Sequence, residues 1–412
     1  MNYKTLAMII LTVIFLYNLL LKVIRWRSAK NPVPVNVADV YDRETYRTWR
    51  NYNAEKSRLS MLSGAVAFLL DILLIGFNIY ALFAAGFPNT PFLRLFAVML
   101  LSALSGVFIL PFEYHDTMVI EEKYGFNRST EKTFWLDQLK SFLIGLILMT
   151  GMAALLMVIH QALGDWMILV FAAAMTLIAL GISFLYPFLS RVFNKFTPLE
   201  DGELKEKLSG LLEKHGYKVR AIQIMDASRR STKSNAYFTG FGKMKTIVLY
   251  DTLVQSMTTE EICAVFAHEM GHGLHKDTLK NAILSFVQML VLGMLAWLTL
   301  RSPEIFTFFG FDQTNYGFAL LLITTVEFAL ISPLFGLVAN AVSRRAEYRA
   351  DAQAVDEGYA DELVSGLKKL AKANFSELAP SPLLVKLEYS HPTLSQRITA
   401  IEKRKAEKTQ KE

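Results

Sequence analysis

The stretch TEEICAVFAHEMGH, residues 259–272, contains the most informative pattern in this chain. Thr258 and Glu261 form a capping-box pattern, which predicts that a helix begins here. The six residues after Glu261 are all apolar, so this helix is expected to begin in the protein interior.

Two histidines, His268 and His272, follow the apolar run and enclose Glu269. Residues four apart share a helical face, so both imidazoles can face one metal ion. Zinc accepts such ligands, and Glu269 is placed to act as the general base of a metalloprotease. The alternative is a pair of structural histidines with partners of their own, because unpaired buried polar groups are costly.

A third ligand is expected far along the chain, and Glu347, in RRAEYRAD at residues 344–351, is the candidate. It directly follows the last apolar span, so it is expected at the same membrane face as the histidines. Asp351 lies four residues later and is placed to accept a hydrogen bond from a liganding histidine. The alternative for both carboxylates is a solvated face paired with the neighbouring arginines.

Long apolar runs explain why 53% of the 412 residues are hydrophobic. Most of these runs are long enough to cross a hydrocarbon core of about 30 Å as helices. We predict seven spans, at Leu6–Leu21, Met61–Ala85, Phe92–Leu110, Phe142–Ile159, Met167–Leu189, Ala282–Leu300 and Phe318–Val342. No small-residue cleavage site follows the first span, so it is expected to be an uncleaved anchor.

Basic residues gather in alternate loops: between spans one and two, between three and four, and after spans five and seven. The positive-inside rule therefore predicts that the N-terminus lies outside and the C-terminus in the cytosol. This bias accounts for the net charge of +6, and no nucleic-acid partner is expected. The single cysteine, Cys263, excludes an internal disulfide and is expected to be a small core residue.

The cytosolic segment Ser190–Lys280 has globular character. A helix is predicted at Glu203–His215 and strands at Ala221–Asp226, Asn235–Phe241 and Thr246–Tyr250, and the helix with the two histidines then runs toward span six. The predicted organisation is five membrane helices in 1–190, a cytosolic metalloprotease segment in 191–280, two membrane helices in 281–342 and a C-terminal cytosolic segment in 343–412. The fold class is an all-α membrane protein with a small cytosolic α+β part.

Several long motifs occur in order along nearly the whole chain. They are EEKYGFN at 121–127, FWLDQLK at 134–140, SNAYF at 234–238, IVLYDTL at 247–253, the metal motifs at 268–272 and 347–351, and SHP at 390–392 with Arg397. Together they resemble the type I CAAX prenyl proteases, which are integral-membrane zinc metallopeptidases that mature prenylated proteins.

The resemblance implies a barrel of seven membrane helices around a hydrophilic chamber, with the zinc site facing inward. It assigns one zinc ion per chain to three ligands and the role of base to Glu269. The ligands would be His268, His272 and Glu347. A chamber would also account for Asp71 and Glu327 inside apparent spans, although pairing between packed helices is the alternative.

The resemblance further assigns substrate contacts. Asn235, with Ala236 and Tyr237, would hold the substrate backbone by strand addition. His391 and Arg397 would contact the substrate or stabilise the oxyanion.

The chain departs from the family pattern in places. The residues after His272 differ in detail, and His275 lies off the face that His268 and His272 share. No C-terminal retrieval signal is evident, so the host membrane is expected to be either a bacterial inner membrane or the endoplasmic reticulum.

Three functions remain open for this sequence. The first is cleavage of a prenylated CAAX protein or peptide before its last three residues. The second is quality control, in which misfolded or stalled membrane proteins are clipped. The third is a transporter or inactive scaffold, which would have no need of three metal ligands and a base. The expected partners are a peptide or protein substrate and the lipid bilayer.

Overall fold

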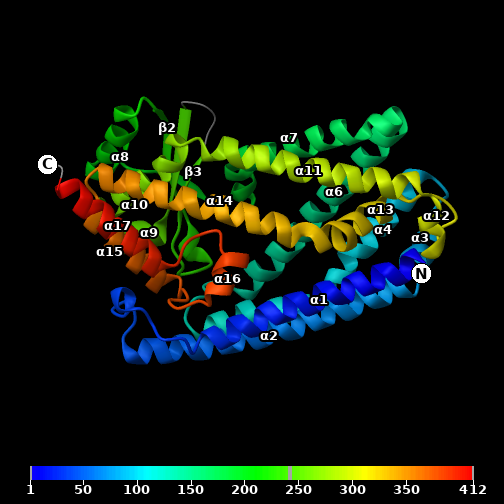
Figure 1. Cartoon of the computed structure of the whole chain (residues 1–412), viewed down its shortest axis with the longest axis horizontal. Helices are drawn as coiled ribbons and strands as arrows, with labels where there is room; N and C mark the ends of the chain where they lie inside the picture. The colour runs from blue at the N-terminus through cyan, green and yellow to red at the C-terminus, as the bar shows by residue number, and fades with distance from the viewer. Residues whose placement is uncertain (1, 240–243, 411–412) are drawn as a thin grey trace.

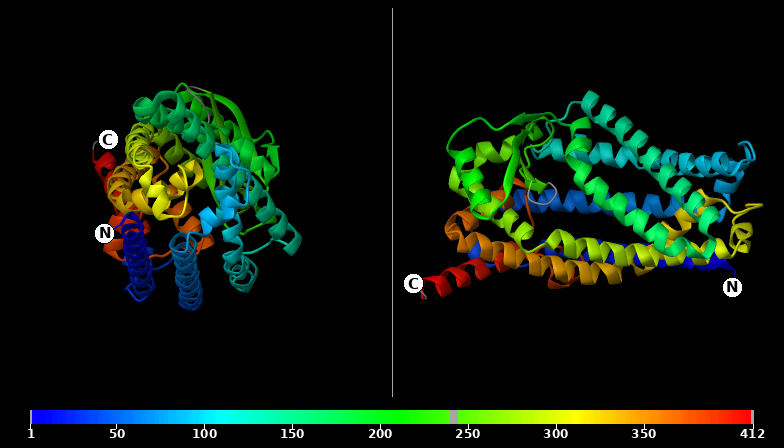
Figure 2. Two further views of the ribbon diagram at one scale, coloured as in Figure 1. Left: turned by 90° about the vertical axis from the view of Figure 1, so that its right-hand side faces the viewer. Right: turned by 90° about the horizontal axis from the view of Figure 1, so that it is seen from above.

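The computed structural model describes residues 2–239 and 244–410 of the chain. The molecule is elongated, and long helices run along its length (Figure 1). The two ends of the chain lie at opposite ends of the molecule, with the small sheet at the same end as the C-terminus (Figures 1 and 2).

Helices make up most of the structure. The first half holds α1 (Tyr3–Ser28), α2 (Arg43–Gly76), α3 (Ile79–Ala85), α4 (Pro91–Ser105), α5 (Leu110–Tyr114), α6 (Glu131–Leu163) and α7 (Met167–Leu189). The second half holds α8 (Glu203–Lys214), α9 (Asp251–Ser256), α10 (Thr259–Leu274), α11 (Asp277–Arg301), α12 (Glu304–Phe308), α13 (Tyr316–Leu321), α14 (Phe328–Asp356), α15 (Ala360–Ala373), α16 (Pro382–Leu387) and α17 (Leu394–Thr409).

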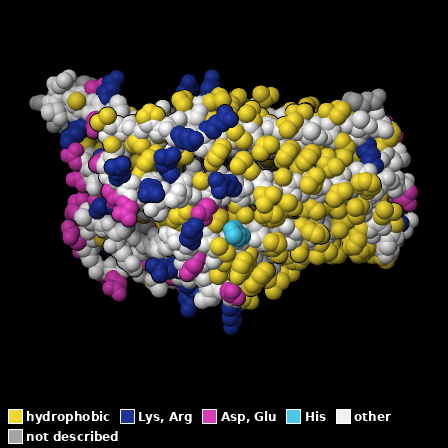
Figure 3. Space-filling model, turned by 90° about the horizontal axis from the view of Figure 1, so that it is seen from below, with side chains coloured by type: hydrophobic (Ala, Val, Ile, Leu, Met, Phe, Trp, Pro, Cys, Tyr) yellow, Lys and Arg dark blue, Asp and Glu magenta, His cyan; other side chains and the backbone are white. Residues whose placement is uncertain are grey.

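The prediction of an all-α membrane protein with a small sheet is confirmed at this level. Within the described residues, six helical segments are long and apolar enough to cross a membrane, and one of them, Glu131–Ile182, joins α6 to most of α7. Large apolar side chains on these helices face outward; Ile147 of α6 and Leu177 of α7 are each 69% exposed. On the face seen in Figure 3, apolar side chains cover the part of the molecule away from the sheet, and charged side chains gather at the end where the sheet lies.

The second predicted span is interrupted. Helix α2 ends at Gly76, and Asn78 adopts a left-handed conformation with φ of 58° before α3 begins. The Lys4 ammonium donates a hydrogen bond of 2.8 Å to the Asn78 side-chain oxygen, which holds this turn. At its other end α2 begins at Arg43, well before the predicted Met61, because helical hydrogen bonding continues beyond the apolar region.

The two acidic residues inside spans have different surroundings. Glu327 lies on a short π-helical turn, Leu322–Glu327, and accepts hydrogen bonds from the hydroxyls of Tyr3 and Thr299. The Glu327 carboxylate therefore links its own turn to α1, which carries Tyr3, and to α11, which carries Thr299. This is the arrangement expected for pairing between packed helices. Asp71 instead lines a cavity of about 220 Å³ between α1 and α2.

The sheet lies at the charged end and has four strands in the order β1-β2-β4-β3. They are β1 (Phe196–Pro198), β2 (Lys218–Met225), β3 (Ala236–Thr239) and β4 (Met244–Tyr250). β2 and β4 are parallel, and β3 pairs antiparallel with β4 at the edge of the sheet. The three predicted strands are confirmed within one to three residues at their starts, whereas β1 was not predicted; residues 240 and 241 of the predicted strand Asn235–Phe241 lie outside the described residues.

Helix α10 begins as its sequence predicts. The Thr258 hydroxyl accepts from the Glu261 N–H at 3.2 Å, and the Glu261 carboxylate accepts from the Thr258 N–H at 2.8 Å. Cys263 on this helix is fully buried, and burial raises the pKa of its thiol to about 11, as expected for an inert core residue. The helix does not run on into α11, because Lys276 between them has φ of 55°.

Helices α10 and α14 pass very close to each other at Gly271. A Cβ atom at this position would lie 2.9 Å from the Ala350 Cα and 3.1 Å from the Gln353 Cβ. Real Cβ atoms are not found so near a backbone carbon, so only glycine permits this approach. Gly271, the fourth residue of the metal motif 268–272, therefore sets the distance between the two helices.

Replacing Gly271 with alanine should push α10 and α14 apart and destabilise the protein by about 1–3 kcal/mol through overpacking. The measurements are thermal unfolding in detergent and the metal content of the purified protein, both of which should fall. Gly210→Ala in α8 is the matched control, because a Cβ there meets nothing within 4 Å. Equal behaviour of the two variants would contradict the close approach.

Candidate metal centre

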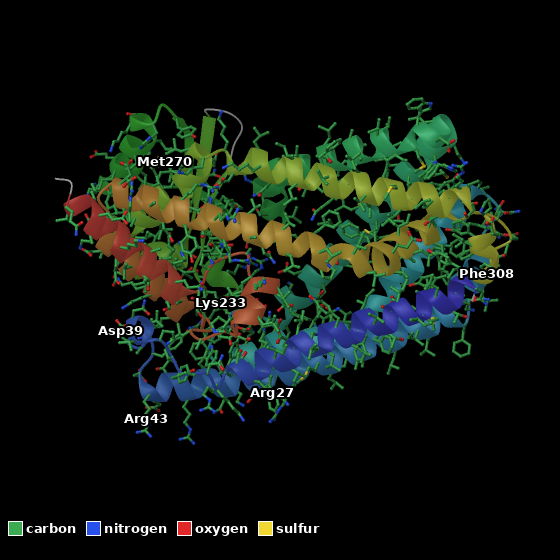
Figure 4. All side chains as sticks on the ribbon, in the orientation of Figure 1. Arg27, Asp39, Arg43, Lys233, Met270 and Phe308 are labelled. Atoms are coloured by element: carbon green, nitrogen blue, oxygen red, sulfur yellow. The ribbon has the colours of Figure 1, made fainter. Side chains whose placement is uncertain are left out.

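The crossing of α10 and α14 brings His268, His272 and Glu347 together. One possible ligand atom from each residue lies within 4.8 Å of the other two. His268 Nε2 is 3.4 Å from Glu347 Oε2, and His272 Nε2 is 3.3 Å from Glu347 Oε1. His268 and Glu347 are buried, at 6% and 4% exposure. Met270, which lies between the two histidines in sequence, marks this region in Figure 4, at the opposite end of the molecule from Phe308.

Each histidine has a second carboxylate on its other nitrogen. His268 Nδ1 lies 2.8 Å from Asp351 Oδ1, and His272 Nδ1 lies 3.2 Å from Asp277 Oδ2. A carboxylate facing Nδ1 favours the tautomer that carries its proton there. The Nε2 lone pair of each ring is then directed at Glu347, which is the arrangement of metal-ligating histidines.

This geometry fits a cation. Two imidazole lone pairs face a carboxylate, and Glu347 Oε2 is buried without a hydrogen-bond partner among the described residues. Acceptors that face one another repel unless a positive charge lies between them. Two imidazole nitrogens and one carboxylate oxygen are a donor set that suits zinc and leaves one coordination position open.

The same carboxylates change how the imidazoles titrate. Burial alone would lower the pKa of His268, but the neighbouring Asp351 and Glu347 carboxylates outweigh it and raise that pKa above its ordinary value. The pKa of His272 is raised in the same way by Glu347. Both shifts mean that the cluster attracts positive charge, either a proton or a metal ion.

Arg397 lies behind the cluster and binds Asp351. Its Nη2 is 2.6 Å from Asp351 Oδ1 and its Nε is 2.9 Å from Asp351 Oδ2, which makes a two-point ion pair. Its Nη1 is 3.5 Å from Glu347 Oε2, and the side chain is only 11% exposed. In this geometry the guanidinium orients the carboxylate that orients His268.

His391 approaches the cluster from the more open side. Its Nε2 lies 3.3 Å from Glu347 Oε1, while its side chain stays 62% exposed. The Ser390 hydroxyl lies 2.8 Å from Nδ1 of the same ring. Glu269 is half-buried on α10 between the two histidines.

The predicted substrate residues lie at the start of the edge strand β3. Asn235 is exposed, and its carbonyl accepts a hydrogen bond of 3.1 Å from the Tyr250 N–H of β4. Its side-chain oxygen accepts from the N–H of Ala236 at 2.9 Å. Ala236 and Tyr237 pair with Leu249 and Val248 of β4, so the strand presents its other edge.

Two residues of this region were not singled out from the sequence. Asp277 binds His272, and it also accepts from Arg349 at 2.7 Å and from Lys280 at 3.0 Å. Asp277 lies in the first turn of α11, only five residues after His272. This short spacing was the one sequence feature that could have suggested the contact. Asn374 binds both main-chain groups of Ser234, and nothing in the sequence connects these two residues.

Replacing Asp277 with asparagine removes the charge behind His272 and keeps the size of the side chain. Loss of such a partner should weaken metal binding about 10–100-fold, measured by competition with a chromophoric chelator. Asp251→Asn is the control, because Asp251 binds the main chain and hydroxyl of Ser228 and no histidine. Unchanged affinity in Asp277→Asn would show that this carboxylate does not support a metal ligand.

Two family descriptions match consecutive parts of the chain. Residues 22–195 match "CAAX prenyl protease N-terminal, five membrane helices", and residues 198–405 match peptidase family M48. The second match contains all of the residues of the cluster described above.

Relatives and a solved structure extend over nearly the whole chain. A CAAX prenyl protease 1 homolog of Arabidopsis thaliana is 35% identical, over 90% of this chain and 90% of its own. CAAX prenyl protease 1 of Saccharomyces cerevisiae is 32% identical over 91% and 90%. The crystal structure of S. mikatae Ste24p superposes with a TM-score of 0.90 at 29% identity, covering 98% of this chain and 99% of that one. The chain therefore belongs to peptidase family M48, as a multi-pass membrane metalloprotease of the type I CAAX prenyl protease group.

Proposed function

We propose that this protein is a zinc-dependent endopeptidase that cleaves prenylated CAAX proteins or peptides near their C-terminus. The observation that carries the reaction is the buried cluster in which two imidazole lone pairs face one carboxylate. The substrate class is taken from the names of the relatives, which are CAAX prenyl proteases along 90% of this chain. A membrane-embedded protease suits a substrate that carries a lipid.

One zinc ion per chain would be held by His268, His272 and Glu347. When bound, it would supply a Lewis acid that polarises the scissile carbonyl and lowers the pKa of water. Glu269 would take the proton of the attacking water and deliver it to the leaving amine. Asp351 and Asp277 would keep the two imidazoles in the tautomer that the site requires.

His391 and Arg397 would assist in different ways. The exposed imidazole of His391 is near enough to Glu347 to contact a substrate at the site. The Arg397 guanidinium is engaged by Asp351, so its contribution to charge stabilisation would act mainly through that carboxylate. Asn235, Ala236 and Tyr237 would offer the open edge of β3 to an extended substrate.

We propose seven membrane crossings around an internal chamber, with the zinc site facing inward. The described residues hold six long apolar segments, and one of them, Glu131–Ile182, contains two helices. The six segments would therefore make seven crossings. An odd number also agrees with chain ends at opposite ends of the molecule (Figure 2). The N-terminus would then lie outside and the C-terminus in the cytosol, in a bacterial inner membrane or the endoplasmic reticulum according to the host.

The chain divisions follow from the same scheme. Residues 1–190 would hold the first five crossings, 191–280 the cytosolic metalloprotease segment, 281–342 the last two crossings, and 343–412 the cytosolic segment after them. The third ligand lies on the same helix as the last crossing, since α14 continues from Phe328 to Asp356.

The decisive experiment compares a farnesylated CAAX peptide with its unlipidated form, with and without a zinc chelator. Mass spectrometry of the products should find release of the last three residues from the farnesylated peptide only, and the chelator should abolish it. Equal cleavage of both peptides would favour membrane quality control. No cleavage and only a trace of zinc would favour a transporter or scaffold.

Glu269→Gln should keep zinc and lose peptidase activity by about three or more orders of magnitude, because the amide cannot accept the proton of water. Metal content and cleavage rate are measured on the same preparation. Undiminished cleavage by this variant would overturn the assignment of Glu269 as base.

A further inference from the structure

A cavity of about 320 Å³ lies between the end of α1 and the first half of α2, and basic side chains surround it. Four of its lining residues are cationic. They are Lys30, which follows α1, and Arg47, Arg50 and Arg58 of α2. Within the described part of the chain, no acidic side chain lines this cavity. It is therefore a concentrated site of positive charge.

These four cations differ from the basic residues around them, because they lack carboxylate partners. Arg25 of α1 pairs with Glu388 at 2.7 Å, and Lys56 of α2 pairs with Asp116 at 2.6 Å. None of the four cations of the cavity forms an ion pair with a carboxylate among the described residues. Their charge is thus available to a group from outside the protein.

Two carboxylates lie about one turn from this group along α2. Glu44 precedes Arg47 and Glu55 precedes Arg58, each by three residues. Neither carboxylate lines the cavity, and that of Glu55 is paired with the Lys123 ammonium at 2.6 Å. Like charges gathered with so little compensation repel one another, so the cavity attracts an anion.

The position of the cavity along the two membrane helices places it at the surface of the bilayer. Exposed leucines continue along α1 as far as Leu20 and along α2 from Leu62, and these two are 57% and 58% exposed. Trp26, which also lines the cavity, lies six residues beyond Leu20, and Arg58 lies four residues before Leu62. At about 1.5 Å per residue, these separations are about 9 Å and 6 Å. The headgroup layer on each side of the hydrocarbon core is about 5–8 Å thick, so both side chains lie in it or beside it.

The arrangement of the helices agrees with this depth. The Lys22 ammonium donates to the Ser60 carbonyl at 2.8 Å, which joins α1 to α2 just inside the cavity. Arg27, next to Trp26, lies about midway along the molecule (Figure 4), and basic side chains border the apolar surface on the face seen in Figure 3. Tryptophan is enriched at the boundary between membrane and water, as expected for Trp26.

We propose that this cavity binds the phosphate headgroup of an anionic membrane lipid. Arginine suits such a group, because its planar guanidinium donates two parallel hydrogen bonds to phosphate oxygens. The acyl chains would lie against the exposed apolar surface of α1 and α2 that begins beside the cavity. Basic pockets between membrane helices are a recognised form of headgroup site. The inference does not depend on the peptidase reaction, so each can fail without the other.

The test measures lipid binding to the full chain in an uncharged detergent. Phosphatidylglycerol and phosphatidylcholine are titrated separately, and bound lipid is counted by native mass spectrometry. Wild-type protein should bind phosphatidylglycerol about tenfold or more tightly than the variant Arg47→Gln/Arg50→Gln/Arg58→Gln, whereas phosphatidylcholine should bind both equally. Because the three guanidinium groups have no ion-pair partner in the described protein, the unfolding temperature without lipid should not fall. If it does fall, Arg50→Gln and Arg58→Gln are measured singly, and each should lose about threefold in affinity.

The matched control removes the same charge from α17, as Lys403→Gln/Lys405→Gln/Lys408→Gln, and should bind phosphatidylglycerol as wild type does. An equal loss of affinity in the two triple variants would show that only net charge matters, and would overturn the site.

Inorganic phosphate and glycerol phosphate distinguish a lipid headgroup from a free anion. At the concentrations of phosphatidylglycerol that raise the unfolding temperature of wild-type protein, neither should raise it. Equal stabilisation by inorganic phosphate would overturn the assignment to a lipid. If wild-type protein does not prefer phosphatidylglycerol to phosphatidylcholine, the inference fails while the proposed function stands.

Discussion

The close approach of α10 and α14 is the constraint on which the functional end of this molecule depends. A Cβ at Gly271 would lie 2.9 Å from the Ala350 backbone, so the two helices touch where the metal motif faces Glu347. Because the helices are this near, imidazoles from one and a carboxylate from the other lie within reach of a single ion. If a side chain at position 271 pushed α10 and α14 apart, His268, His272 and Glu347 would no longer lie within reach of one ion.

Charge is arranged in layers around that crossing. The inner layer holds the two Nε2 atoms and Glu347, and the next holds Asp351 and Asp277. The cations Arg397 and Arg349 pair with these outer carboxylates, and Arg397 also reaches Glu347 of the inner layer at 3.5 Å. A buried carboxylate is costly without such partners, so the arginines make the acidic side chains tolerable and fix their direction. The orientation of each ring then follows from the partner on its far nitrogen.

The membrane part contributes position as well as anchoring. Glu121, in the segment between α5 and α6, binds Tyr52 and Lys56 of α2 and also Lys233 beside the edge strand. The Arg128 N–H donates to the Arg230 carbonyl, and the Asp137 carboxylate of α6 accepts from the Arg230 side chain. The segment just before β3 is thus bound to membrane helices and to the loop between them. Glu121 and Asp137 belong to the motifs at 121–127 and 134–140. These two motifs hold no catalytic or metal-ligating residue, and their contacts give them a structural role instead.

Local patterns in the sequence determined much of this protein. Helical spacing placed His268 and His272 on one face, long apolar runs located the membrane helices, and short runs typical of strands predicted β3 and β4. Each of these signals depends on neighbours within a few residues. Partners that are distant along the chain were decided only by the tertiary structure. Arg397 on Asp351 and Asn374 on Ser234 are such partners, and no local periodicity records how the segments that carry them meet. Asp277 is only five residues from His272, but their contact depends on the turn at Lys276 between α10 and α11. The sequence therefore determined which groups are available, and the packing of α10, α14 and α15 decided which of them meet.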